Sequence, residues 1–120
     1  MPVDIPGIDA QIVLDLYDND EEVYETILRS FVSRIPAVLD KMRDISSETL
    51  PDYLIKIHSL KGSGGNVGAK GIAAEAARLE AMAKNGDLTG IQAWNGDFLV
   101  KIGVLLEDIK KWLEQIDAKN

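Results

Sequence analysis

The sequence contains no cysteine and a single histidine, His58. The absence of cysteine excludes disulfides, thiolate nucleophiles and cysteine-ligated zinc or iron–sulfur sites. A metal centre built from several histidines is excluded in the same way. We therefore expect this chain to hold no metal.

Basic residues are also in the minority. The 13 lysines and arginines stand against 20 aspartates and glutamates, which gives a net charge of −7. This balance disfavours a broad basic surface for nucleic acid or anionic lipid. Aromatic residues make up only 6% of the chain, which is poor for stacking bases. We expect no nucleic-acid partner.

Long apolar runs are missing as well, so no segment is expected to span a bilayer. The N-terminus, MPVDIPGIDAQIV, has no basic region followed by an apolar stretch, and a secretory signal is therefore not indicated. We expect a cytoplasmic protein without membrane insertion. The 120 residues have the length of one domain, and 46% hydrophobic with 28% charged residues is typical of a folded chain.

Apolar residues recur at helical spacing almost throughout, without a useful stretch of strand-like alternation. Ile8, Ile12 and Leu16 indicate a short first helix behind Asp9, a residue type that commonly caps helices. Asn19, with a glutamate three residues later, has the spacing of a capping box. It predicts the start of a second helix.

The second helix carries Pro36 inside its apolar stripe, where we expect a kink rather than an end. Pro51 indicates the first turn of a third helix, which runs toward the glycine-rich residues 62–66. A fourth helix is expected to stop at Asn85-Gly86. The last helix has two series of apolar residues at seven-residue spacing, which predict a sustained core seam.

These elements predict an all-α fold. Four long amphipathic helices with short connections form an up-and-down four-helix bundle, here with a short additional N-terminal helix. No internal repeat or low-complexity segment divides the chain. Residues 1–7 are expected to be a linker, and residues 8–120 the bundle domain.

One face of the third helix is hard to explain by folding alone. His58 lies one step round from the apolar stripe, and Lys61, Gly62 and Gly65 follow it by three, four and seven residues, so they share its face. Glycine inside a helix costs stability, and two bare positions beside an imidazole favour close approach by another protein. A structural interpretation stays open, in which the glycines end the helix and His58 is partly buried.

The run His58-Ser59-Leu60-Lys61-Gly62-Ser63, followed by Val67-Gly68-Ala69, resembles the signature of histidine-containing phosphotransfer (HPt) domains of bacterial two-component phosphorelays. The similarity extends from about Ile5 to the final helix. It includes the acidic turn before the second helix and Pro36 within that helix. Gly64 departs from the family pattern, which usually has Ser or Ala there.

The resemblance implies that His58 accepts a phosphoryl group from an aspartyl phosphate on a receiver domain and passes it to a second response regulator receiver. A neutral imidazole suits this role near pH 7, because its ordinary pKa is about 6.5. In the family a Gln or Glu on the following helix binds the histidine ring, and Glu80 occupies the matching position. An acid there orients the ring and stabilises the positive charge that develops during transfer.

The positions of Glu80 and Lys61 also allow other interpretations. Glu80 is also spaced to pair with Lys84 or Arg78 as a solvated surface acid. Lys61 is expected beside the phosphoryl oxygens, where an ammonium group offsets negative charge, but a solvent-facing lysine fits the same pattern.

Docking of a receiver is expected on the exposed edge of the third helix and on apolar residues of the first two helices, namely Ile12, Leu16 and Val23. No nucleotide-binding loop is visible, because the residues around Lys70 lack the order of a Walker motif. We therefore expect a phosphoryl carrier and not an enzyme, with no cofactor of its own. The resemblance implies that Mg²⁺ is supplied by the receiver partner.

Two further functions stay open. The same residues would serve a substrate domain that an ATP-dependent sensor histidine kinase of the chemotaxis type phosphorylates directly. They would have no chemical role in a non-catalytic helical docking module with a structural His58. The chain fits a free-standing protein or a domain of a hybrid sensor kinase, and we expect a monomer because one docking face suffices.

Overall fold

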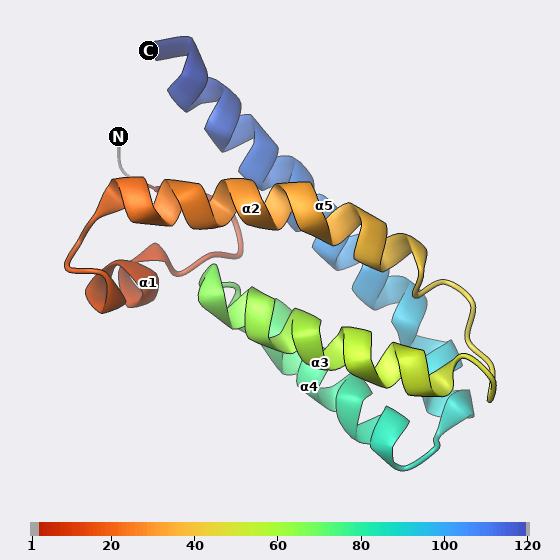
Figure 1. The fold of residues 1–120 in the computed structure, drawn as a ribbon. Coiled ribbons are helices and arrows are strands. Elements are labelled where there is room, and N and C mark those ends of the chain that lie inside the picture. The colour runs from red at the N-terminus through yellow and green to blue at the C-terminus, as the bar shows by residue number, and fades with distance from the viewer. Residues whose placement is uncertain (1–2, 120) are drawn as a thin grey trace.

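The computed structural model describes residues 3–119, and within that range every regular element is a helix (Figure 1). Five helices follow one another in the chain: α1 (Ala10–Leu16), α2 (Glu21–Asp40), α3 (Leu50–Asn66), α4 (Lys70–Lys84) and α5 (Leu88–Lys119). The expected all-α fold, with four long helices behind a short one, is confirmed.

The four long helices alternate in direction along an elongated molecule of 48 × 25 × 19 Å (Figure 1). α3 and α4 form a close antiparallel pair, and α5 packs against both α4 and α2. The short helix α1 lies at the end of the molecule where α3 finishes and α2 begins (Figure 1). α1, the start of α2 and the C-terminal end of α3 therefore meet at one end of the bundle.

The start of α2 differs from the prediction by one residue. Asp20 is the N-cap, and its carboxylate accepts hydrogen bonds from the backbone N–H groups of Glu22 at 3.0 Å and Val23 at 3.3 Å. Asn19 lies in the preceding turn with a φ of 61°, a left-handed conformation that asparagine adopts readily. The prediction of a capping box at Asn19 is therefore wrong. Asp9 does occupy the N-cap position of α1, but its side chain makes no capping hydrogen bond.

Two helices continue through residues that normally weaken helices. α2 runs through Pro36 without ending there, and α3 runs through its glycines as far as Asn66. The interpretation that the glycines end α3 is therefore wrong. Gly64 lets α3 and α4 approach closely, because a methyl group there would lie 3.3 Å from Cγ2 of Ile72 and 3.4 Å from the backbone nitrogen of Ala73.

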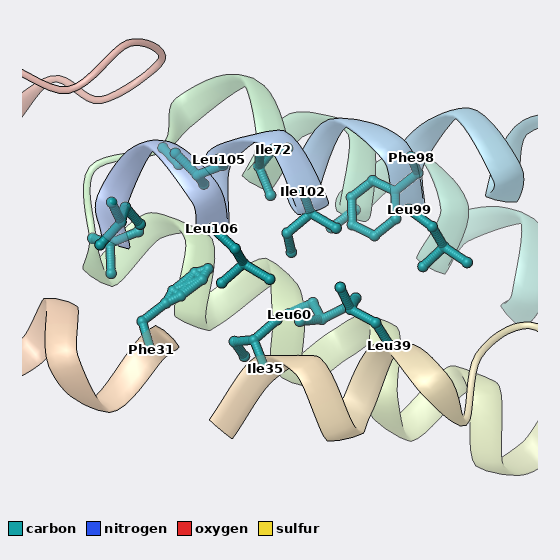
Figure 2. Packing of buried hydrophobic residues seen from close by; sticks show 14 of the residues in the cluster. Phe31, Ile35, Leu39, Leu60, Ile72, Phe98, Leu99, Ile102, Leu105 and Leu106 are labelled. Carbon is teal, nitrogen blue, oxygen red and sulfur yellow. The ribbon is translucent and has the colours of Figure 1, made fainter. Parts of the chain in front are cut away.

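The core lies where the four long helices meet, and Figure 2 shows side chains from α2, α3, α4 and α5 converging on it. Burying one large apolar side chain stabilises a fold by roughly 1.5–3 kcal/mol. The seam predicted for the last helix is the largest contributor. The buried apolar residues of α5 are Ile91, Phe98, Leu99, Ile102, Leu105, Leu106, Ile109, Trp112 and Leu113.

Two buried tyrosines fasten the helix ends to one another. The hydroxyl of Tyr24 donates to the carbonyl oxygen of Val67 at 2.5 Å and so joins the start of α2 to the end of α3. The hydroxyl of Tyr53 donates to Oδ1 of Asn95 at 2.8 Å, and Nδ2 of Asn95 donates to the carbonyl oxygen of Met42 at 2.8 Å. Burial raises the pKa of both phenols, that of Tyr24 to about 12.

Part of the segment expected as a linker packs on the bundle. Ile5 is buried in the core, and its carbonyl oxygen accepts a hydrogen bond from the backbone N–H of Ile8 at 3.1 Å. Residues 1–2 of that segment, and residue 120 of the expected domain, lie outside the described residues. Across the described chain, no helix is long and apolar enough to cross a membrane.

Candidate functional site

His58 lies in the middle of α3 and is open to solvent, with 68% of its side chain exposed. Its neighbours Ile57 and Leu60 are buried in the core. The apolar spacing of α3 therefore turns the imidazole outward, as expected for a residue one step round from the core stripe. A histidine this exposed does not contribute to the core.

Glu80 of α4 binds both polar groups on the His58 face of α3. Its Oε2 is hydrogen-bonded to Nδ1 of His58, and its Oε1 accepts a hydrogen bond from Nζ of Lys61 at 2.6 Å. The two partners are three residues apart on α3, so one carboxylate reaches both across the helix pair. Glu80 is the buried member of this group, with 6% of its side chain exposed.

The charge state of Glu80 follows from these contacts. The hydrogen bond from Lys61, and then that from His58, lower the pKa of Glu80 to about 2, against the opposing effect of burial. Both contacts favour the ionised carboxylate, so Glu80 is an anion at neutral pH and accepts hydrogen bonds only. Its contact with Nδ1 of His58 therefore requires a proton on Nδ1. In the neutral ring, the free lone pair is then on Nε2.

The other pairings considered for Glu80 are not the ones formed. The guanidinium of Arg78 lies over the ring of Trp94, 4.7 Å from its centroid. Lys84 acts on Glu80 only through its charge, and this is the weakest of the influences on that carboxylate. Lys61 is engaged by Glu80 and is not a freely solvated lysine.

The bare positions expected beside the imidazole are open. Apart from neighbouring residues of α3 itself, a methyl group at Gly62 or Gly65 would meet nothing within 4 Å. The apolar residues expected for docking are exposed too: Ile12 and Val23 partly, and Leu16 to 74%. They lie on α1 and the start of α2, at the end of the bundle where α3 finishes (Figure 1).

Two further exposed apolar residues, one close to His58 on α3 and one directly after α1, were not indicated by the sequence pattern. Ile55 is 69% exposed and precedes His58 by three residues on α3. Tyr17 is exposed directly after α1. The available signal was a large apolar residue on an otherwise polar helix face, which often marks an interaction surface.

The described residues offer no site for a metal ion. Between residues 3 and 119, no three His, Asp, Glu or Cys side chains are grouped so that they could hold one. The polar groups on this surface are an exposed imidazole, a carboxylate hydrogen-bonded to it and an ammonium group bound to the same carboxylate.

The helical bundle thus presents a solvent-exposed imidazole that is hydrogen-bonded to a buried carboxylate. The family model of the Hpt domain matches residues 26–119, which run from the second turn of α2 to the end of α5 and include His58, Lys61 and Glu80. The chain belongs to the Hpt domain family. No match was found among curated proteins or among solved structures.

Membership of this family defines the general activity. Hpt domains are phosphotransfer carriers that act through a histidine in two-component signalling, without an ATP site of their own. They interact with response regulator receivers and with kinases. His58 is the only histidine in the chain.

Proposed function

We propose that this chain is a cytoplasmic phosphorelay intermediate. His58 accepts a phosphoryl group from the aspartyl phosphate of one receiver domain and donates it to another response regulator receiver. The observation that supports this most strongly is the exposed imidazole whose Nδ1 is bound to the buried carboxylate of Glu80. In the neutral ring, this contact leaves the lone pair of Nε2 as the nucleophile.

The transfer step follows from that tautomer. The lone pair of Nε2 on His58 forms an N–P bond while the P–O bond to the receiver's aspartate breaks, and the aspartate leaves as a carboxylate. Nδ1 keeps its proton, so the ring gains positive charge. The Glu80 carboxylate is already in place to stabilise that charge. The same bond changes in reverse pass the phosphoryl group to the next receiver.

Lys61 supplies positive charge to the phosphoryl group. Its Nζ has three donors, and the contact with Glu80 at 2.6 Å uses one of them. The remaining donors are available to phosphoryl oxygens on His58, one helical turn away. Glu80 thereby acts as a positioning residue for both side chains.

The receiver is proposed to dock on the open surface around the histidine. Gly62 and Gly65 allow its backbone to come close, while Ile12, Leu16 and Val23 supply apolar contact. The Mg²⁺ that the transfer requires is expected in the receiver. Because a single docking face of this kind suffices, the chain is proposed to act as a monomer.

Phosphoryl acceptance tests the proposal directly. The protein is mixed with phosphorylated receiver domains from its own organism in Mg²⁺ buffer, and intact mass is followed for a phosphate that is labile in acid and stable in base. We expect label on the wild-type chain and none on the His58→Gln variant. Label that persists in the variant would remove His58 from the mechanism.

The same experiment separates the other functions. Label that arises only from an ATP-fed kinase domain would make the chain a direct kinase substrate. A folded chain that binds a partner but is labelled by neither donor would be a docking module. Both outcomes contradict the relay proposal.

A further inference from the structure

A pocket of about 340 Å³ opens between the middle of α2 and the C-terminal end of α3. It is outside the group formed by the histidine, the lysine and the glutamate. Its lining combines buried or half-buried apolar side chains with more exposed polar ones. The apolar residues used below are Ile27, Phe31 and Val67, and the polar ones are Arg34, Ser63 and Asn66.

Arg34 is the unusual member of this pocket. Its Nε donates to Oγ of Ser30 at 3.0 Å, and within residues 3–119 its two terminal NH₂ groups have no carboxylate partner. The other three arginines have partners. Arg29 binds two carboxylates and Arg43 binds one, while Arg78 lies over an aromatic ring. The chain has seven more acidic than basic residues. An arginine without a carboxylate partner in such a chain is available to a carboxylate of another molecule.

The pocket shares α3 and the end of α1 with the proposed docking surface. Ser63 and Asn66 follow His58 on α3 by five and eight residues, which is about 8–12 Å along the helix axis. Tyr17, which also lines the pocket, directly follows the exposed Leu16. Since α1, the start of α2 and the end of α3 lie at the same end of the bundle (Figure 1), a receiver that docks there comes within reach of the residues that line this pocket.

We propose that Arg34, with Ser63 and Asn66, binds an acidic side chain on the surface of the docked receiver, and that this contact helps to select the receiver. The inference rests on the proposed function, because it requires a receiver at His58. A guanidinium binds a carboxylate through two parallel hydrogen bonds. The hydroxyl and amide of its neighbours add donors, and the apolar lining accommodates the aliphatic stem of a glutamate.

The test compares Arg34→Ala and Arg34→Glu with Arg43→Ala. The control residue is an exposed arginine directly beyond the end of α2 that is paired with Asp40 and does not line the pocket. Receiver-to-carrier transfer is measured against receiver concentration at low and high salt. We expect the half-saturating concentration to rise about tenfold for Arg34→Ala and further for Arg34→Glu, with the maximal rate nearly unchanged. The control should match the wild type.

A small phosphoryl donor distinguishes docking from chemistry. Phosphoramidate needs no docking surface, so it should label His58 equally in all three variants and the wild type. A receiver with one surface acid changed to lysine should restore transfer to the Arg34→Glu variant. The inference is overturned if both Arg34 variants saturate like the wild type, or if Arg43→Ala loses as much. If neither donor labels the wild-type chain, the proposed function fails instead.

Discussion

Glu80 performs two tasks at the scale of a single residue. One carboxylate oxygen sets the tautomer of His58 and the other holds Lys61. Glu80 is itself buried among small neighbours on α4, so its position is fixed by the helix pair and not by the flexible side chains that it binds. Substitutions at this one position therefore separate the charge of the site from its geometry.

We expect graded losses of transfer at position 80. Glu80→Gln keeps an acceptor for Nδ1 of His58 but removes the charge, so the transfer rate should fall about tenfold. Glu80→Ala removes both and should reduce the rate on the order of 10–100-fold, as is typical when the group orienting a functional imidazole is lost. Single-turnover transfer from a saturating phosphorylated receiver measures both rates. Equal rates for wild type and Glu80→Ala would show that the carboxylate has no part in the reaction.

The depressed pKa of Glu80 makes a prediction about stability and pH. Its pKa is about 2 in the folded protein against an ordinary value of 4.5, so its contacts stabilise the fold fully above about pH 4.5. That contribution is lost as the pH falls from there toward 2. In urea unfolding, Glu80→Gln should be less stable than the wild type at pH 7, and the difference should shrink progressively below pH 4.5. A difference that stays constant down to pH 2 would contradict the contacts with Lys61 and His58.

At the scale of the elements, α3 carries glycines with opposite roles. Gly62 faces open space, whereas Gly64 lies against α4. We expect Gly62→Ala to raise the free energy of unfolding by about 0.5–1 kcal/mol, because alanine favours a helix over glycine. Gly64→Ala should gain less or lose stability, since its methyl group meets Ile72 and Ala73. Chemical denaturation compares the two.

A bulky side chain at the open position tests its role in docking. Gly62→Leu should keep the fold and the labelling by phosphoramidate but slow transfer from a receiver, because the added side chain occupies the approach to His58. Glycine 96 on α5 is equally open, and Gly96→Leu should leave both reactions unchanged. Wild-type transfer in Gly62→Leu would mean that partners do not approach over this face.

Helix number, order and buried faces were predictable because apolar periodicity reports burial directly. The seam of α5 is the clearest case. The N-cap of α2 was less predictable, because Asn19 and Asp20 offer similar acceptors and only the backbone path decides between them. The length of α3 was ambiguous for a related reason: its glycines weaken a helix, and the packing of Gly64 against α4 is a tertiary effect.

The candidate site was predictable only in part. The spacing of His58, Lys61 and Gly62 placed them on one face without reference to any other helix. The contact of Lys61 with Glu80 depends on how α3 and α4 cross, and the pattern of one helix does not contain that information. The position of Glu80 came from the family resemblance. Arg34 gave no signal, since only the fold shows which arginine lacks an acid.

At the scale of the whole molecule, Asn95 joins three parts of the chain. It connects Tyr53 of α3 and the carbonyl of Met42 beyond α2 to α5. Asn95→Ala leaves both groups buried without these partners and should lower the free energy of unfolding by roughly 1–3 kcal/mol. The exposed Gln115, further along α5, is the control, and Gln115→Ala should change stability by under about 0.5 kcal/mol. Urea unfolding measures both, and an unchanged Asn95→Ala would exclude a role for this network in holding the bundle together.

The proposed function also divides the reaction between two molecules. This chain contributes the imidazole and the charges around it, and the receiver contributes Mg²⁺. Chelation by EDTA should therefore stop transfer from a phosphorylated receiver while labelling of His58 by phosphoramidate and the thermal unfolding of the isolated chain stay the same. Restoring Mg²⁺ in excess of the chelator should restore transfer, which controls for damage to either protein. If EDTA lowered the melting temperature or slowed phosphoramidate labelling, this chain would itself depend on a metal, and the division of the chemistry between carrier and receiver would have to be redrawn.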